Sequence, residues 1–127
     1  MRRTILIVED AHQLASALEI ALLGIPEACV MHACSGSRAL ELLETSSEDA
    51  IAVLVTDLHM PAMDGFELIE RVRARSGRLP IVVVSGDTDP ATPERLRRLG
   101  VDAYFPKPYS PLQVRKKVEE LLDAATS

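Results

Sequence analysis

The sequence predicts an α/β fold in which helices cover both faces of a five-stranded parallel sheet. Short β-branched apolar runs alternate with amphipathic helical stretches along the chain. Residues 51–55 are apolar on both faces, which suits a strand buried between two helical layers. Two strands end in acidic residues, Glu9-Asp10 and Asp57, at the sheet edge where such folds bind ligands. We therefore expect a flavodoxin-like, doubly wound sheet with the strand order 2-1-3-4-5.

The composition fits one globular domain. The chain has 127 residues, and we expect residues 1–127 to form one domain with a core from about residue 4 to residue 122. Apolar residues make up 47% of the chain and aromatic residues 3%, so Leu, Val, Ile and Ala must build the core. The net charge of -5 argues against contact with nucleic acid. No apolar run approaches the ~20 residues of a membrane span, and the acidic N-terminal segment is unlike a signal peptide, so we expect a cytoplasmic protein.

Five strands are predicted from short runs rich in β-branched residues. They cover residues 4–8, 28–33, 51–56, 80–85 and 101–105. The only cysteines are Cys29 and Cys34. If both lie on one strand, their odd spacing puts them on opposite faces, so we expect buried or half-buried free thiols.

Five helices are predicted from their caps and from apolar residues at helical spacing. The expected inward residues are Leu14, Leu18, Ala21 and Leu22 in the first helix, Leu40 and Leu43 in the second, Phe66, Ile69 and Val72 in the third, and Leu112, Val118, Leu121 and Leu122 in the last. Ser35 and Ser110 are suited to cap the second and the last helix. The short fourth helix starts at Pro90 or Pro93, since Pro is tolerated at the first helical position. Residues 44–49 are polar and predict a loop.

Asp57 lies at the carboxyl end of the third predicted strand. The next helix starts only at Asp64-Gly65, so Asp57 is too early to cap it and is free for chemistry. In the predicted strand order, the first and third strands are neighbours, which brings Glu9, Asp10 and Asp57 into one crevice. Three carboxylates repel one another unless a cation lies among them. Hard oxygen ligands in an open crevice suit Mg²⁺.

Ser85 and Lys107 follow the fourth and fifth predicted strands and so lie at the same sheet edge. A hydroxyl group and an ammonium group around a carboxylate, together with Mg²⁺, suit a phosphoryl group. An aspartate carboxylate can act as the nucleophile that forms an acyl phosphate. A lysine is a compact charge on a long stem, suited to follow phosphate oxygens.

These motifs resemble those of the receiver domain of two-component response regulators. The resemblance covers about residues 4–122. It rests on Glu9-Asp10, on Asp57 followed by Met60-Pro61 and Met63-Asp64-Gly65, on Ser85-Gly86 and on Lys107-Pro108. It implies a phosphorelay switch in which Asp57 accepts a phosphoryl group from a sensor histidine kinase or a histidine phosphotransfer domain. It also implies that the chain is not an enzyme, apart from at most weak self-dephosphorylation.

The resemblance also implies roles for the residues around Asp57. Asp10, and Glu9 through water, would hold Mg²⁺ together with Asp57 and the backbone carbonyl of His59. Lys107 and Ser85 would bind the phosphoryl group. Ser85 and Tyr104 would form the switch, and the Lys107-Pro108 bond would be cis, which proline permits.

The output surface implied by the resemblance is the face of the fourth helix, the fifth strand and the fifth helix. An output protein or domain would bind there, and a phosphorylation-dependent homodimer stays open. The resemblance also implies that His59 and Asp87 lie at positions where the family varies, on either side of the path of the hydrolytic water. They can hydrogen-bond each other, and we expect them to tune the lifetime of the phosphoryl group. Met1 favours a separate receiver over the receiver portion of a larger regulator or hybrid kinase.

Four alternatives stay open at this point. An aspartyl-phosphate enzyme of the haloacid dehalogenase type usually has a second Asp two residues after the nucleophile, where this chain has His59. A flavodoxin-like cofactor binder needs a phosphate-binding loop where this chain has Glu9-Asp10. A degenerate receiver that acts only as a binding module would not need the intact acidic set. A transition-metal site with His12 and His59 lacks a zinc-binding pattern.

Overall fold

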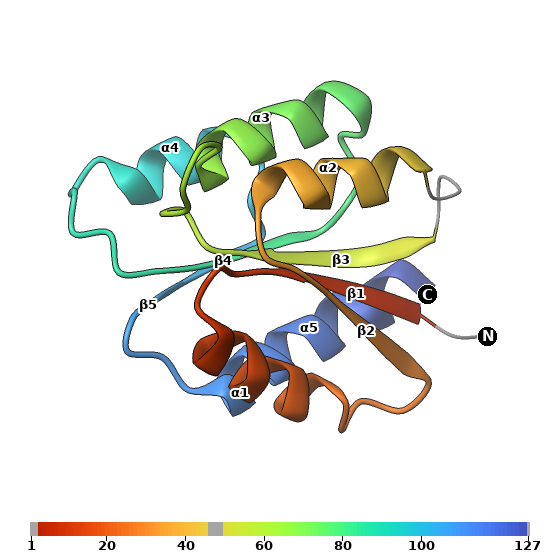
Figure 1. Ribbon diagram of the computed structural model, residues 1–127. Coiled ribbons are helices and arrows are strands. Elements are labelled where there is room, and N and C mark those ends of the chain that lie inside the picture. Colours follow the sequence, from red (N-terminus) through yellow and green to blue (C-terminus); the bar gives the residue numbers. More distant parts are fainter. Residues whose placement is uncertain (1–2, 46–49, 127) are drawn as a thin grey trace.

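The chain forms a five-stranded parallel sheet with helices on both faces (Figure 1). The structure, a computed structural model, describes residues 3–45 and 50–126. The strands are β1 (Arg3–Val8), β2 (Ala28–Ala33), β3 (Ile51–Thr56), β4 (Ile81–Ser85) and β5 (Ala103–Pro106). The helices are α1 (His12–Leu22), α2 (Gly36–Thr45), α3 (Gly65–Arg75), α4 (Thr92–Arg98) and α5 (Pro111–Thr126). The strand order is β2-β1-β3-β4-β5, which confirms the predicted flavodoxin-like topology.

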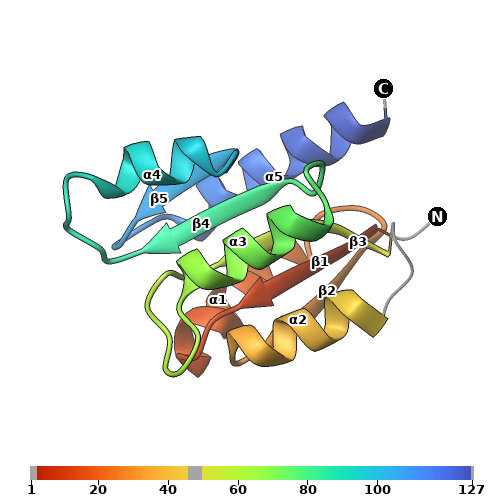
Figure 2. The ribbon, with the colours of Figure 1, turned by 90° about the horizontal axis from the view of Figure 1, so that it is seen from above.

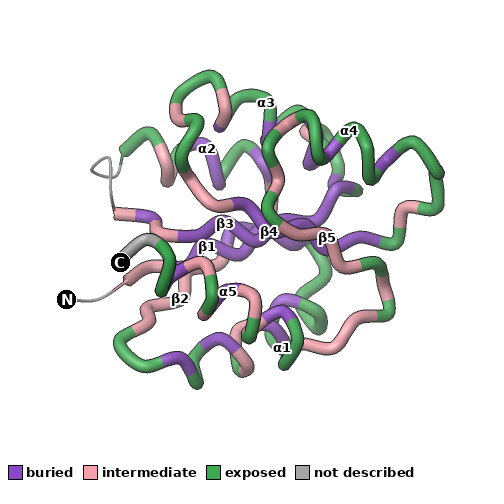
Figure 3. Tube along the Cα trace, turned by 180° about the vertical axis from the view of Figure 1, so that it is seen from behind, coloured by how far each residue is buried: buried purple, intermediate pink, exposed green. Residues whose placement is uncertain are grey.

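Two helical layers enclose the sheet. Helices α2, α3 and α4 lie on one face, and α1 and α5 lie on the other (Figures 1 and 2). Successive residues of β1 point to opposite faces, so that Leu6 and Val8 join the core under the first layer while Ile5 and Ile7 join the core under the second. The buried strands run through the middle of the molecule between more exposed helices (Figure 3). This two-sided burial explains the nearly continuous apolar sequence of the central strands.

The inward faces of α1 and α5 differ from the prediction at one residue each. Leu14 is 37% exposed and Leu112 is 66% exposed, so the prediction that they belong to the buried inward faces is wrong. Residues two apart on a helix point to nearly opposite sides. Because Val114 and Val118 face the sheet, Leu112 must face away from it. Apolar spacing alone could not show which of two adjacent stripes the sheet would bury.

Smaller differences concern element ends. The helix α4 starts at Thr92 with Pro93 in its first turn, which decides between the two predicted prolines. Of the predicted loop 44–49, residues 44 and 45 belong to α2, and residues 46–49 lie outside the described ranges. Cys29 is half-buried and Cys34 is exposed, just beyond the end of β2, so the expectation of burial fails for Cys34; both thiols are free.

The fifth strand begins two residues later than the prediction. Gly100 has a φ of 75°, a left-handed conformation that favours glycine, and it ends the helical segment. The Asp102 carboxylate then accepts a hydrogen bond from the backbone N–H of Ile81 at 2.8 Å. Asp102 is therefore part of the turn, and regular pairing with β4 starts at Ala103.

The guanidinium group of Arg73, in the last turn of α3, joins three segments of backbone. It donates hydrogen bonds to the carbonyl oxygens of Leu99 at 2.9 Å, Leu79 at 2.8 Å and Gly100 at 2.8 Å, and to that of Ser76 at 3.3 Å. These bonds tie the end of α4 and the start of β4 to α3. Hydrogen bonds from a charged donor are stronger than those from a neutral one.

We expect Arg73→Met to lower the free energy of unfolding by about 2 kcal/mol, because the substitution keeps the stem but leaves the carbonyl groups without their charged donor. Urea unfolding measures the change. Arg75→Met is the matched control, since Arg75 is an exposed arginine of the same helix. Equal losses in the two variants would contradict a special role for the Arg73 bonds.

Candidate functional site

Three acidic side chains meet at the carboxyl edge of β1 and β3. Glu9 and Asp10 follow β1, and Asp57 follows β3. One carboxylate oxygen from each lies within 4.8 Å of the others. Glu9 is fully buried, Asp57 is 4% exposed, and Asp10 is exposed to solvent. The cluster is therefore open on the side of Asp10 and closed on the side of Glu9, as an ion-binding crevice requires.

The backbone after β3 holds the Asp57 carboxylate in place. Asp57 Oδ1 accepts hydrogen bonds from the backbone N–H groups of Leu58 at 2.6 Å and His59 at 3.2 Å. The turn is closed by the Gly65 N–H, which donates to the Leu58 carbonyl at 2.8 Å. A Cβ atom at position 65 would collide with the Asp57 carbonyl oxygen, so only glycine permits this close approach. Asp64 caps α3 by accepting a hydrogen bond from the N–H of Glu67 at 2.9 Å, at the point where the sequence predicts that the helix starts.

Lys107 bridges the two buried carboxylates. Its Nζ atom lies 2.9 Å from Asp57 Oδ2 and 3.1 Å from Glu9 Oε1. The Lys107-Pro108 peptide bond is cis, as expected. Burial alone would lower the pKa of Lys107, but the hydrogen bonds to Asp57 and Glu9 outweigh it and raise that pKa. Lys107 is therefore a fixed positive charge facing the candidate phospho-acceptor.

The two buried carboxyl groups titrate differently. Burial, and then the neighbouring Asp57 carboxylate, raise the pKa of Glu9 to about 7. Burial would also raise the pKa of Asp57, but the hydrogen bonds from Lys107 and from the backbone of His59 hold it below its ordinary value. Asp57 is thus ionised at neutral pH, which is the form a nucleophile needs.

The three carboxylate side chains also suit a hard cation such as Mg²⁺. Glu9 Oε2 is buried and has no hydrogen-bond partner among the described residues. A buried carboxylate oxygen without a partner is costly, and a nearby cation, reached through a bound water, would compensate that cost. Among the described residues, Glu9, Asp10 and Asp57 are the one group of three side chains with metal-ligand spacing.

Ser85 and Tyr104 are connected through the backbone of Asp87. Ser85 is fully buried, and its Oγ atom accepts a hydrogen bond from the Asp87 N–H at 3.1 Å. The Tyr104 hydroxyl group donates to the Asp87 carbonyl oxygen at 3.2 Å. A movement of Ser85 would therefore shift the backbone of Asp87, and with it the hydrogen bond of Tyr104.

His59 and Asp87 face each other across the mouth of the site. His59 Nε2 lies 3.3 Å from Asp87 Oδ2. The N–H of Asp89 donates to Asp87 Oδ1 at 2.7 Å, and this bond, with His59 nearby, lowers the pKa of Asp87. The predicted contact between His59 and Asp87 is therefore present, and Asp87 is its ionised carboxylate.

The ring contact of His12 is with His32 and not with His59. Its ring packs edge-on against His32 of β2, with the ring centroids 6.0 Å apart. The structure thus pairs His12 with a residue that the sequence analysis did not single out. The transition-metal alternative, which required His12 beside His59, has no support in this arrangement.

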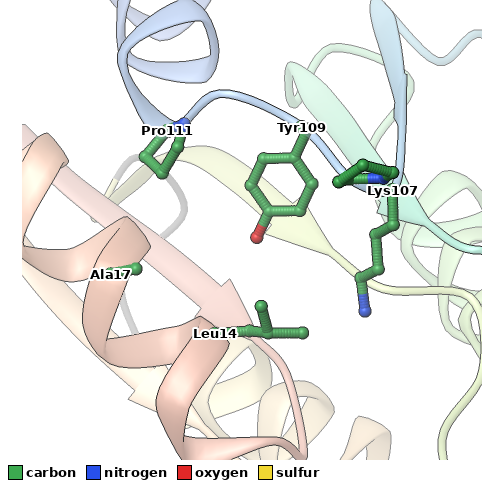
Figure 4. Close-up of a pocket in the computed structure, with 6 residues that line it drawn as sticks. Leu14, Ala17, Lys107, Tyr109 and Pro111 are labelled. Atoms are coloured by element: carbon green, nitrogen blue, oxygen red, sulfur yellow. The ribbon is translucent and has the colours of Figure 1, made fainter.

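A cavity beside the site involves Tyr109, which sequence reasoning missed. The cavity has a volume of about 380 Å³ and is lined by Leu14, Ala17, Lys107, Pro108, Tyr109 and Pro111. The Tyr109 hydroxyl group points toward α1 (Figure 4), and its oxygen is buried without a partner among the described residues. Burial, and then the charge of Glu9, raise the pKa of Tyr109 to about 12, so it stays a neutral phenol. Its position two residues after Lys107 was the only signal in the sequence.

The fold and the acidic edge with its bridging lysine match what is expected of a receiver domain. The chain belongs to the response regulator receiver domain family, whose model matches residues 5–119. It therefore acts in two-component phosphorelay signalling. This membership excludes the alternatives of a haloacid dehalogenase-type enzyme and a flavodoxin-like cofactor binder.

Known proteins support the assignment over nearly the whole chain. A chemotaxis protein CheY homolog of Campylobacter jejuni is 32% identical over 120 residues, which are 93% of this chain and 91% of that protein. The transcriptional regulatory protein TctD of Salmonella typhimurium is also 32% identical over 120 residues, but these are 51% of its length. A response regulator receiver protein of Pseudomonas putida has a TM-score of 0.82 at 30% identity and covers 98% of each chain. None of the helices in the described ranges has the length and apolar character to span a membrane.

Proposed function

We propose that the chain, acting as one receiver domain, accepts a phosphoryl group on Asp57 in a Mg²⁺-dependent step. The observation that carries the proposal is the Lys107 bridge, which holds an ionised Asp57 beside a fixed ammonium group. A carboxylate oxygen of Asp57 attacks phosphorus, and the bond between phosphorus and the donor imidazole nitrogen breaks, with its electron pair returning to that imidazole. The Lys107 ammonium group then pairs with a phosphoryl oxygen instead of the free carboxylate.

Asp10, Asp57 and the backbone carbonyl of His59, with Glu9 through water, would hold the Mg²⁺ ion. The ion would neutralise the repulsion between the acidic cluster and the incoming phosphoryl group. Glu9 Oε2, buried without a partner, and the solvent-exposed Asp10 support this arrangement. A protein phosphohistidine on a sensor histidine kinase or a histidine phosphotransfer domain is the donor class.

Ser85 and Tyr104 would transmit the modification. In the proposed switch, Ser85 moves to hydrogen-bond the phosphoryl group, which releases the Asp87 N–H, and Tyr104 follows because it holds the same residue's carbonyl. The affected surface is the face of α4, β5 and α5, where an output protein or domain, or a second copy of the chain, would bind.

The test uses intact mass spectrometry with Mg²⁺ and acetyl phosphate as a small phosphodonor. We expect a gain of one phosphoryl group per chain that depends on Mg²⁺ and is removed by alkali or hydroxylamine, as for an acyl phosphate. A chain that gains no phosphoryl group while it is folded would contradict the proposal and support a degenerate receiver that acts as a binding module.

We further expect the His59–Asp87 pair to protect the phosphorylated site from water. The two side chains bridge neighbouring loops across the mouth at 3.3 Å, so they fill space that small residues would leave to solvent. The double variant His59→Ala with Asp87→Ala should lose its phosphoryl group severalfold faster than the wild type, measured as a half-life by intact mass.

The matched control for this pair is Glu67→Ala with Arg71→Ala, which removes an exposed ion pair on α3. We expect the control to keep the wild-type half-life. A longer half-life in the His59 and Asp87 double variant would show that the pair orients the hydrolytic water instead of excluding it.

A further inference from the structure

The peptide group between Glu9 and Asp10 is held by the edge strand β2. The N–H of Glu9 donates to the carbonyl oxygen of Ala33 at 3.1 Å, which extends the β1–β2 ladder one residue past the end of β1. The carbonyl oxygen of Glu9 accepts a hydrogen bond from His32 Nε2 at 2.7 Å. A carbonyl oxygen carries no proton, so Nε2 must be the donor. The imidazole thus takes the place of the next backbone donor in the ladder.

This bond orients both acids of the pair. The Glu9 carbonyl group and the Asp10 nitrogen belong to one planar peptide unit. A rotation of that plane changes ψ of Glu9 and φ of Asp10, the two backbone angles that set the path of the chain carrying both side chains. One of these side chains is the buried Glu9 carboxyl group with its unpartnered oxygen, and the other is the exposed Asp10 carboxylate.

Lys107 holds the Glu9 carboxyl group at 3.1 Å, but no side-chain capping bond holds the backbone where the acidic pair leads into α1. Ala11 is the N-cap residue of α1 and makes no side-chain capping bond. A Ser, Thr, Asn or Asp at that position would have anchored the loop locally. His32 itself is braced by the ring of His12, the first residue of α1, whose centroid lies 6.0 Å away at an interplanar angle of 81°.

We propose that His32 is a positioning residue of the phospho-acceptor site, which sets the orientation of the Glu9-Asp10 pair and thereby its affinity for Mg²⁺. The inference rests on the proposed function, because it assumes that the pair binds Mg²⁺. In this role His32 would act through the peptide unit, without direct contact to the ion or the phosphoryl group. Residues that orient metal ligands by hydrogen bonds, without contacting the metal themselves, commonly have large effects on metal affinity.

The experiment is a titration of the metal-free protein with Mg²⁺, followed by isothermal calorimetry or amide chemical shifts. His32→Phe keeps a ring but removes the donor, and we expect it to bind Mg²⁺ about fivefold more weakly, as suits the loss of one hydrogen bond. His32→Gln carries an amide donor in place of the imidazole, and we expect its affinity to return to within about twofold of the wild type. His12→Phe is the control, since it replaces the neighbouring ring and keeps the His32 bond.

Urea unfolding of each variant without Mg²⁺ separates positioning from stability. A loss of Mg²⁺ affinity in His32→Phe that His32→Gln reverses, at similar stability, supports the positioning role. Wild-type affinity in His32→Phe, or equal losses of affinity in His32→Phe and His32→Gln, would overturn the positioning role while leaving the proposed function intact. A wild-type chain that binds no Mg²⁺ would overturn both.

Discussion

Asp57→Asn is expected to abolish phosphorylation by acetyl phosphate. Asparagine has nearly the same shape, so the backbone N–H groups of Leu58 and His59 can still donate to its oxygen. An amide, however, is not the anionic nucleophile that forms an acyl phosphate. It also removes one negative charge from the proposed cation site and the partner charge of Lys107. The loss should be complete within the detection limit of intact mass spectrometry.

Asp64→Asn is the matched control for Asp57→Asn. Asp64 lies in the same loop and caps α3 through the N–H of Glu67, and Asn is about as good a cap as Asp. We expect this variant to be phosphorylated like the wild type. Labelling that survives in Asp57→Asn and maps to a serine or histidine would place the acceptor elsewhere.

The second large effect concerns Glu9 and the pH dependence of stability. Burial, and then Asp57, raise the pKa of Glu9 from 4.5 to about 7. Between these values the folded chain holds a proton that the unfolded chain has released, so the free energy of unfolding falls as the pH rises through this window. Each pKa unit is worth about 1.4 kcal/mol, which gives a loss of up to about 3 kcal/mol.

Glu9→Gln should remove this loss, because a neutral amide has no proton to release. In metal-free urea unfolding at several pH values from about 5 to about 8, the wild type should lose stability with rising pH, and Glu9→Gln should overtake it toward pH 8. Asp57 does not produce this trend. The pKa of Asp57 is lowered in the folded chain. Its contribution to the free energy of unfolding is therefore fully present at pH values above the ordinary Asp pKa, and it is lost only at more acidic pH.

Glu44→Gln is the control for Glu9→Gln, since Glu44 is exposed at the end of α2. We expect this variant to follow the wild-type curve. Parallel pH curves for the wild type and Glu9→Gln would show that Glu9 is already ionised in the folded chain, and that the Lys107 ammonium group outweighs its burial.

The sequence by itself predicted the strands, their parallel order and the acidic edge. These features depend on local patterns: continuous apolar runs flanked by turns, and polar residues such as Asp57 and Ser85 where the runs end. The flavodoxin-like strand order expected for five such units then makes β1 and β3 neighbours. The roles of the individual residues came from resemblance to a family and were not worked out from spacing.

Only the tertiary structure decided which groups share a hydrogen bond. Lys107 and Glu9 are 98 positions apart in the chain. Their contact depends on how far β1 and β5, the strands that precede them, extend along the sheet relative to each other. The side of α5 that is buried, with Leu112 exposed, follows from how the helix lies on the sheet. His32 and Arg73 act on backbone carbonyl groups, which every residue carries, so no side-chain pattern marks their partners. Local patterns specify which elements form, whereas these contacts depend on angles and distances that are fixed only when the elements pack together.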